Sequence, residues 1–207
     1  MIPVAEKLSR GLHPSVPYAE IPDFMVELRG REAMAAAALE FTILTAARTN
    51  ETLGATWDEI DLKAGIWVIP GSRMKKGREH RVPLSGRALE LLEQTQQLGS
   101  PYLFPASKGG RMSNMAMSML LRRMKPDATI SVHGFRSSLR GWAAERTNFA
   151  WEICETALSH VTGTKTEAAY FRTDLLEKRR KMMDAWANFC GQPAKLSDTV
   201  RPIRAAA

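Results

Sequence analysis

Ser131-Val-His-Gly-Phe-Arg-Ser-Ser-Leu-Arg-Gly-Trp142 opens the stretch around which this chain is organised, which runs from Ser131 to Arg180. His133 and Arg136 stand three residues apart, so on a helix the two basic side chains share one face and can converge on a single anion. A guanidinium binds a phosphate through two parallel hydrogen bonds, and an imidazole adds a donor or a base according to its protonation. The pair therefore predicts a site that handles phosphate groups.

Two further polar residues follow along the chain. His160 stands in Leu158-Ser-His160, and Tyr170 precedes a helical run that begins at Asp174. A tyrosine hydroxyl has a reference pKa of about 10, so it is a weak nucleophile at neutral pH unless a base or a positive charge assists it. Taken alone, each histidine would more often be structural, and Tyr170 would more often be a half-buried core residue.

The order of the set changes that balance. Arg48 and Lys75 lie upstream, in Thr45-Ala-Ala-Arg-Thr-Asn-Glu51 and Met74-Lys-Lys-Gly77. With the residues above they form the series Arg, Lys, His-x-x-Arg, His, Tyr, which resembles the catalytic domain of tyrosine recombinases, the phage integrase family. The resemblance covers roughly residues 17 to 190, and its context is most similar to integrases of satellite phages and genomic islands, in Ala55-Thr-Trp-Asp-Glu-Ile-Asp-Leu62, Arg81-Val-Pro-Leu-Ser85 and Ala168-Ala-Tyr-Phe-Arg172.

The resemblance implies a role for each matching residue. Tyr170 would attack a DNA phosphodiester and form a 3′-phosphotyrosine bond, while Arg48 and Arg136 stabilise the charge that develops on the phosphate. His160 would donate a further hydrogen bond, and His133 would be the assisting base. Lys75 would protonate the departing 5′ oxygen, with Lys76 as the alternative. No cofactor and no metal are implied.

Arg48 also has a structural explanation. It directly follows an apolar, alanine-rich segment, and a charged side chain placed there needs a partner. A salt bridge with Glu51 is the competing interpretation of this residue.

Composition agrees with a polyanionic partner without identifying one. The chain has 207 residues and a formal net charge of +7, with 44% hydrophobic and 25% charged residues. Its two cysteines, Cys154 and Cys190, show no spacing typical of a disulfide framework or a zinc site. We expect double-stranded DNA as the partner, with backbone contacts from basic residues that could equally form a solvated face: Lys76, Arg78, Arg81, Arg111, Arg122 and Arg123.

Periodicity predicts a mainly α fold with a small antiparallel β-sheet, an α+β class. The sheet is expected between residues 60 and 84, where turn residues separate short β-rich runs. Helices are expected over residues 21–28, 32–47, 86–98, 113–124, 132–146, 150–157 and 174–190. The last of these would pack on its own core or, as in related recombinases, on a neighbouring protomer.

The expected organisation is a linker or remnant of a DNA-binding segment over residues 1–16, a catalytic domain over 17–191 and a flexible tail over 192–207. Neither a signal peptide nor a membrane-length apolar run is visible, so we expect a cytoplasmic protein. Family members usually carry a helical DNA-binding domain before this point. An excised domain, a truncated gene and an unusually short relative are all open interpretations.

The resemblance therefore predicts a site-specific DNA recombinase, an integrase that integrates and excises a mobile element. It would be a monomer when free and a homotetramer on recombining DNA. Two alternatives are open: relaxation of DNA by the same chemistry, as in type IB topoisomerases, and a truncated DNA-binding module that no longer cuts. The second would bind DNA in a salt-sensitive manner without a covalent product.

Overall fold

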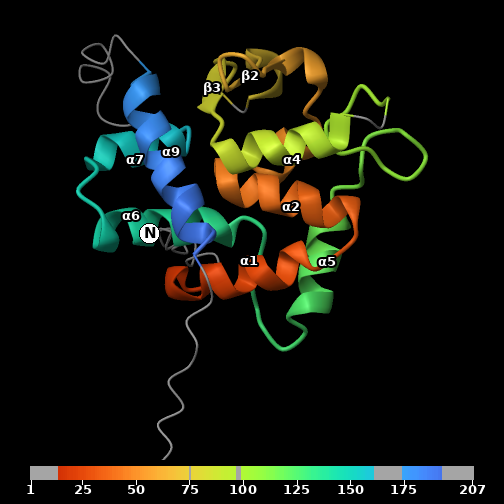
Figure 1. The fold of residues 1–207 in the computed structure, drawn as a ribbon, viewed down its shortest axis with the longest axis horizontal. Helices are drawn as coiled ribbons and strands as arrows, with labels where there is room; N and C mark the ends of the chain where they lie inside the picture. Colours follow the sequence, from red (N-terminus) through yellow and green to blue (C-terminus); the bar gives the residue numbers. More distant parts are fainter. Residues whose placement is uncertain (1–13, 75, 97–98, 161–173, 193–207) are drawn as a thin grey trace, which may run out of the picture.

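Helix α2 (Met34–Thr45) lies at the centre of the fold, and its second half is buried almost completely. Its run of alanine and leucine favours a helix, and its small side chains let neighbours approach on every side. Helix α9 (Leu176–Cys190) packs against its C-terminal end, where Trp186 of α9 donates a hydrogen bond to the carbonyl of Ile43 at 2.9 Å. The final helix thus packs on its own chain (Figure 1).

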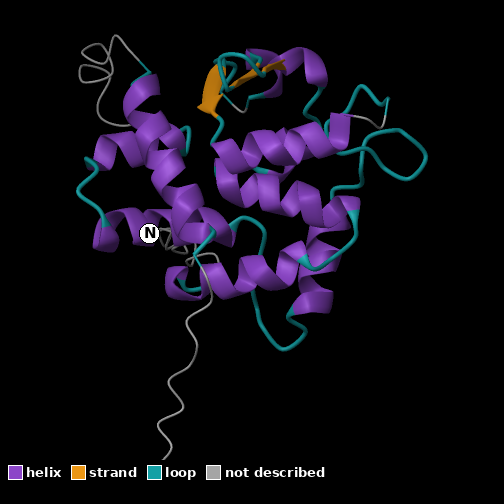
Figure 2. Cartoon of the chain, viewed as in Figure 1, coloured by secondary structure: helices purple, strands orange, loops and turns teal. Residues whose placement is uncertain are grey.

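The computed structural model describes residues 14–74, 76–96, 99–160 and 174–192. In these residues the regular secondary structure is mostly helical, and the short strands lie together at one end of the structure (Figure 2). Around α2 and α9 lie the other helices of the described residues: α1 (Ile21–Arg29), α3 (Thr49–Leu53), α4 (Gly86–Gln96), α5 (Ala116–Met124), α6 (Gly134–Arg146) and α7 (Trp151–Ala157). The described residues also form three short 3-10 turns: η1 (Tyr18–Glu20) before α1, η2 (Trp57–Glu59) before β1 and η3 (Gly71–Arg73) in the loop that joins β2 to β3.

The sheet has three antiparallel strands in the order β1 (Ile60–Asp61), β2 (Ile66–Ile69) and β3 (His80–Pro83). Trp67 of β2 pairs with Val82 of β3, and its ring lies 5.4 Å from that of Phe41 on α2. This aromatic contact anchors the sheet on the central helix. The loop that joins β2 to β3 carries Lys75.

The sheet is also joined to α9. Arg179 is completely buried and donates to the carbonyl of Arg81 on β3 and to the carbonyl and carboxylate of Asp174. Arg81 in turn forms two hydrogen bonds to the Asp174 carboxylate, at 2.8 and 2.7 Å. Strand β3 follows the loop that carries Lys75, and α9 follows Tyr170 in the sequence. These contacts therefore fix β3 to α9.

The predicted fold class, mainly α with a small antiparallel sheet, is confirmed. Several details differ from the sequence-based expectation, among them the bounds of two helices: α2 covers Met34–Thr45 and not residues 32–47, and α9 begins at Leu176 and not at residue 174. Helix α6 begins at Gly134, so His133 is its N-cap residue and not a member of the helix. Helix α5 begins at Ala116 with Met115 as N-cap, not Ser113. The short helix α3 was not predicted, because five residues give too little periodicity to detect.

Among the helices described here, none is both long and apolar enough to cross a membrane. Val16, which the sequence placed in the linker, is buried in the hydrophobic core. Residues 1–13 and the tail from residue 193 lie outside the described residues, so the expected bounds of the catalytic domain stay a prediction.

Candidate active site

Arg136 is held between the ends of two helices. Only 5% of the residue is exposed, and its guanidinium donates to the carbonyls of Ala46 and Leu158. Ala46 is the C-cap of α2, and Leu158 is the C-cap of α7. Carbonyls at helix C-termini lack intrahelical partners and carry partial negative charge, so both ends stabilise a buried cation.

The turn from Leu158 to His160 has the hydrogen bonds of a Schellman motif. The amide of His160 donates to the carbonyl of Glu155, and the amide of Ser159 donates to that of Thr156. Ser159 has a φ of 50°, the left-handed conformation that such a motif requires and that glycine adopts most easily. The motif leaves the Leu158 carbonyl directed at Arg136 and sets the direction of His160.

His160 bridges an acid and a base. Its Nδ1 lies 2.9 Å from Oε2 of Glu155, and its Nε2 lies 3.3 Å from Nη2 of Arg136. A guanidinium can only donate, so Nε2 accepts from Arg136 and Nδ1 carries the hydrogen that is donated to Glu155. Arg140 lies 3.0 Å from the other oxygen of Glu155. The buried carboxylate therefore orients the imidazole.

Arg48 lies beside Arg136, at the N-cap of α3. Its Nη2 is 3.5 Å from the Leu158 carbonyl that Arg136 also contacts. Its Nη1 forms an ion pair with Glu51 at 2.8 Å, and its backbone amide donates to the same carboxylate. The salt bridge with Glu51 expected from the sequence is confirmed, and it fixes the guanidinium next to that of Arg136.

Two guanidinium groups so close together create a positive site. Burial lowers the pKa of Arg136 to about 10, and the neighbouring charge of Arg48 acts in the same direction. Arg136 remains charged at neutral pH, so an arriving anion would relieve the repulsion between the two cations. This arrangement can bind the nonbridging oxygens of a phosphate.

His80 belongs to the same region and was missed by the sequence reasoning. Burial lowers its pKa to about 4, with further lowering by the charges of Arg179 and Arg48, against the opposing effects of Glu51 and a hydrogen bond to the carbonyl of Ala157. A neutral imidazole on β3 therefore contacts the end of α7. The only signal was its place in the short β-rich run at residues 80–83, where three polar residues in a row at 79–81 hide any alternation that would mark His80 as buried.

The structure does not place the other residues predicted for the site in the group formed by Arg48, Arg136 and His160. His133 is exposed at the start of α6. Lys75 and Tyr170 lie outside the described residues. Lys76 and Arg78 are exposed on the hairpin next to Lys75.

The predicted DNA contacts do not form one group. Nη2 of Arg111 lies 3.5 Å from Oδ1 of Asn50, which follows Arg48 by two residues on α3. Arg81, by contrast, is paired with Asp174. Arg122 and Arg123 are exposed in the last turn of α5, where the helix approaches α1 through the Lys125–Glu27 ion pair. These two arginines thus lie at the opposite end of α5 from Met117, which contacts Thr42 on α2.

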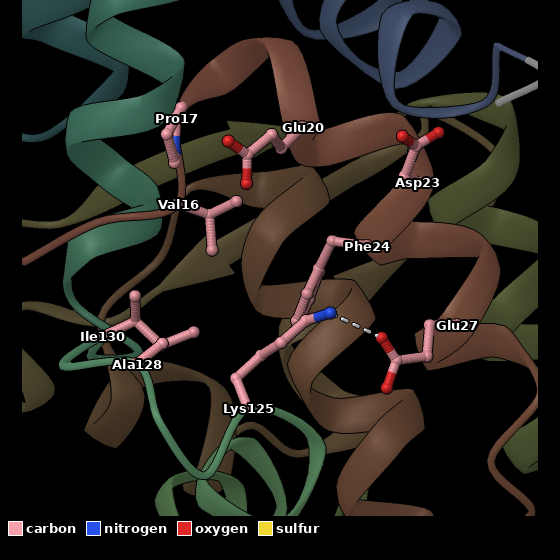
Figure 3. Close-up of a pocket in the computed structure, with 9 residues that line it drawn as sticks. All are labelled: Val16, Pro17, Glu20, Asp23, Phe24, Glu27, Lys125, Ala128 and Ile130. Atoms are coloured by element: carbon pink, nitrogen blue, oxygen red, sulfur yellow. Dashed lines mark ion pairs between the residues drawn. The ribbon is translucent and has the colours of Figure 1, made fainter. Parts of the chain in front are cut away.

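A cavity of about 470 Å³ lies elsewhere, between α1 and the segment that follows α5 (Figure 3). Its apolar wall includes Val16 and Phe24, and its rim is acidic except for the Lys125–Glu27 ion pair. It contains none of the predicted catalytic residues. In the described part of the chain, no three histidine, cysteine or acidic side chains form a group that could hold a metal ion.

Comparison with solved structures defines the class of fold. The chain is similar to a lambda integrase tetramer bound to a Holliday junction, with a TM-score of 0.59 and 17% identity over 83% of this chain and 51% of that chain. At this identity the likeness shows the fold, that of a tyrosine recombinase catalytic domain.

Sequence comparison then places the chain in its family. The profile of the "Phage integrase family" matches residues 16–174. The prophage integrase IntA of Escherichia coli K12 is 34% identical over 189 residues, 88% of this chain and 46% of that protein. The integrase of enterobacteria phage P4 is 34% identical over 199 residues, 86% of this chain and 45% of that protein. The chain belongs to the phage integrase family and spans about half the length of these curated relatives.

Proposed function

We propose that this chain is the catalytic part of a site-specific DNA recombinase, which cuts and rejoins DNA strands through a 3′-phosphotyrosine intermediate. The observation that carries the proposal is the convergence of Arg48, Arg136 and His160 on the turn at Leu158. These three residues come from segments far apart in the sequence. Arg48 has a carboxylate partner in Glu51, but Arg136 forms no ion pair with a described residue and is held by carbonyls alone, so two guanidiniums stand side by side with one paired carboxylate.

The cluster is suited to the transition state of strand cleavage. Attack on a phosphodiester places additional negative charge on the nonbridging oxygens, and fixed cations stabilise that charge without reorganising. Arg136 is fixed by the carbonyls of Ala46 and Leu158, and Arg48 by Glu51. His160 would turn its Nε2 from Arg136 to the phosphate and donate a hydrogen bond there once protonated.

The nucleophile, acid and base complete the proposal. Tyr170 would attack the phosphorus, Lys75 would protonate the leaving 5′ oxygen, with Lys76 as the alternative, and His133 would assist as base. The anchors of these segments support this assignment, because Asp174, four residues after Tyr170, is paired with Arg81 on the strand that follows the lysine hairpin. The phosphotyrosine bond keeps the energy of the original phosphodiester, so rejoining needs no other energy source.

The partner would be double-stranded DNA, which suits the net charge of +7. Four copies would act together on two duplexes, as the tetrameric lambda integrase on a Holliday junction suggests. Integration and excision of a mobile element in the bacterial cytoplasm, on nucleoid DNA, would be the biological outcome. Arg111 and the hairpin residues Lys76 and Arg78 would contact the DNA backbone near the cut.

The test is incubation of the chain with nicked duplexes that carry the flanking attachment sequence, resolved on a denaturing gel. The unmodified chain should form a DNA-linked band that Tyr170→Phe does not form. If Tyr170→Phe keeps the band, the proposed nucleophile is wrong. Relaxation of supercoiled plasmid without a specific site would favour topoisomerase chemistry, and a salt-sensitive shift on a native gel without any covalent band would favour a non-cutting DNA-binding module.

A further inference from the structure

The segment over residues 14–18, at the start of the described chain and ending at the first residue of η1, lies against α6, the helix that carries Arg136. Residues 14–18 run beside one face of this helix, and Val16 is buried against the core. Three hydrogen bonds join the segment to α6 and to the loop before it, at intervals of seven residues. The Ser131 amide in the loop donates to the Pro14 carbonyl at 3.1 Å, and the Ser138 hydroxyl on α6 donates to the Val16 carbonyl. The Tyr18 hydroxyl of the segment donates to the Glu145 carboxylate on α6 at 2.7 Å.

Small residues of α6 allow this close approach. Gly134 and Gly141 stand on the face that residues 14–18 cover. A β-carbon on Gly134 would lie 2.9 Å from Cα of Ser15 and closer still to the carbonyl oxygen of Pro14, and both are backbone atoms that cannot turn aside. Any side chain at position 134 therefore displaces either the segment or the first turn of the helix.

The first turn of α6 is also the turn that positions Arg136. Gly134 stands between His133 and Arg136, and its amide donates to both the carbonyl and the hydroxyl of Ser131. Ser131 is the residue that binds the Pro14 carbonyl. The segment thus holds the loop before the helix and the first helical residue at once.

The opposite side of the segment is not covered in the same way. Val16 and Pro17 form one wall of the cavity between α1 and the segment after α5 (Figure 3). The hydrogen bonds to α6 and the burial of Val16 therefore determine where the segment lies, while Val16 and Pro17 border the cavity. Displacement at Gly134 would push the segment toward this cavity or push the helix away from it.

We propose that residues 14–18 form a strap that positions the first turn of α6, and through it Arg136, for strand cleavage; this inference rests on the function proposed above. Gly134 is then a positioning residue, required because the strap passes directly over it. A misplacement of about 1 Å near a reacting group can slow a reaction by roughly a hundredfold, so a displaced strap would be felt mainly in the chemical step.

The test compares Gly134→Ala with Gly141→Ala in the full chain. The control stands on the same helix and under the same strap, but a β-carbon at Gly141 would lie 3.5 Å from Cδ1 of Tyr18, which is an ordinary contact. We expect Gly134→Ala to slow covalent complex formation at saturating DNA by at least about tenfold and to change DNA affinity by less than about twofold. Gly141→Ala should change neither quantity by more than about twofold.

Hydrogen exchange measured by mass spectrometry separates this inference from the proposed function. Gly134→Ala should accelerate exchange over residues 131–138, and Gly141→Ala should not. If Gly134→Ala does not fold, Ser138→Ala replaces it, since that change removes the bond to Val16 without adding volume. It should likewise slow the chemical step and accelerate exchange.

Each outcome has one meaning. If Gly134→Ala and the unmodified chain cleave DNA equally well, the inferred role of residues 14–18 is wrong, while the proposed function stands. If the unmodified chain forms no covalent product, the proposed function is wrong. The exchange measurement alone then tests whether residues 14–18 position the first turn of α6. Unchanged exchange in residues 131–138 would mean that they do not.

Discussion

Nε2 of His160 lies 3.3 Å from Nη2 of Arg136, so in the free protein the histidine accepts a hydrogen bond from the arginine beside it. Arg136 belongs to α6, whereas His160 follows α7, and the two meet because both contact the turn at Leu158. A phosphate oxygen that entered here would compete with His160 for the same guanidinium hydrogen. Nη2 of Arg136 can therefore exchange its bond to His160 for one to substrate, whereas the buried Nε of Arg136 has no hydrogen-bond partner among the described residues.

Replacement of Arg136 by lysine should impair cleavage severely. A lysine ammonium cannot reach the carbonyls of Ala46 and Leu158 with the fixed geometry of a guanidinium, so the positive charge would be misplaced even though it is retained. Loss of one such stabilising group costs about a hundred- to a thousandfold in rate. Single-turnover formation of the covalent DNA complex measures this loss.

Arg140→Lys is the matched control for that experiment. Arg140 stands one turn further along α6, is half exposed and pairs with Glu155 at 3.0 Å, a bond that lysine can replace. We expect cleavage within about threefold of the unmodified chain. An equal loss in both variants would mean that the helix as a whole, and not the guanidinium of Arg136, carries the effect.

An inorganic oxyanion should stabilise the folded chain through the same cluster. Phosphate or sulfate at about ten times its Kd would add about 1.4 kcal/mol to the free energy of unfolding and raise the Tm by about 3 to 5 °C. Arg48→Gln should abolish the shift, because the second guanidinium is lost. Differential scanning fluorimetry at constant ionic strength gives the readout.

Arg122→Gln serves as the control for the oxyanion effect, since Arg122 is exposed in the last turn of α5 and forms no ion pair with any residue that the structure describes. Its anion-dependent shift should equal that of the unmodified chain. If Arg48→Gln keeps the full shift, the anion binds elsewhere on the basic surface.

The fold and family of this chain were largely predictable from the sequence. Helical periodicity identified most of the long helices, and alanine-rich, apolar composition identified α2, which is buried on all sides. The buried stripe of α5, with Met117, Leu121 and Met124, is core as such stripes usually are. The catalytic candidates came from an ordered series of residue types, not from any one motif. That series pointed to Arg48, Arg136 and His160, which the fold brings together.

The supporting residues could not be predicted, because their roles depend on contacts between distant segments. Glu155 in sequence is one acid in a short helix, and only the turn at Ser159 brings His160 back to it. Gly134 belongs to the motif in sequence, yet a side chain is excluded at this position because the backbone of Pro14, far upstream, lies against it. Backbone carbonyls, such as that of Leu158, leave no trace in residue type at all.

Ser159→Gly should stabilise the protein. Ser159 holds a φ of 50° in the Schellman turn, a conformation that costs a residue with a β-carbon about 1 kcal/mol more than glycine. Glycine loses more entropy on folding, so we expect a net gain of about 0.5 kcal/mol in the free energy of unfolding, measured by urea denaturation.

Ser159→Val completes that comparison. A β-branched side chain fits the left-handed conformation least well, so the turn should shift, and with it the Leu158 carbonyl and His160. We expect lower stability and slower cleavage together. Equal stability of the glycine and valine variants would show that the φ of residue 159 carries no strain.

His80 should make the protein less stable in mildly acidic solution. Its folded pKa is about 4, mainly because of burial, whereas an unfolded histidine titrates near about 6.5. Below pH about 6.5 the unfolded chain binds a proton that the native imidazole refuses, so the free energy of unfolding falls as pH decreases toward 4, by up to about 1.4 kcal/mol for each pH unit. The contribution is constant above this window, where both states are neutral.

His80→Gln isolates this effect, because glutamine can still donate to the carbonyl of Ala157 but does not titrate. Urea denaturation at pH 7, 6 and 5 keeps clear of the acidic groups Asp174 and Glu27, whose lowered pKa values affect stability only in more acidic solution. The unmodified chain should lose stability over this range relative to the variant. Parallel curves for the two proteins would mean that His80 is protonated in the folded state as readily as in the unfolded one, which the charges of Arg179 and Arg48 beside it oppose.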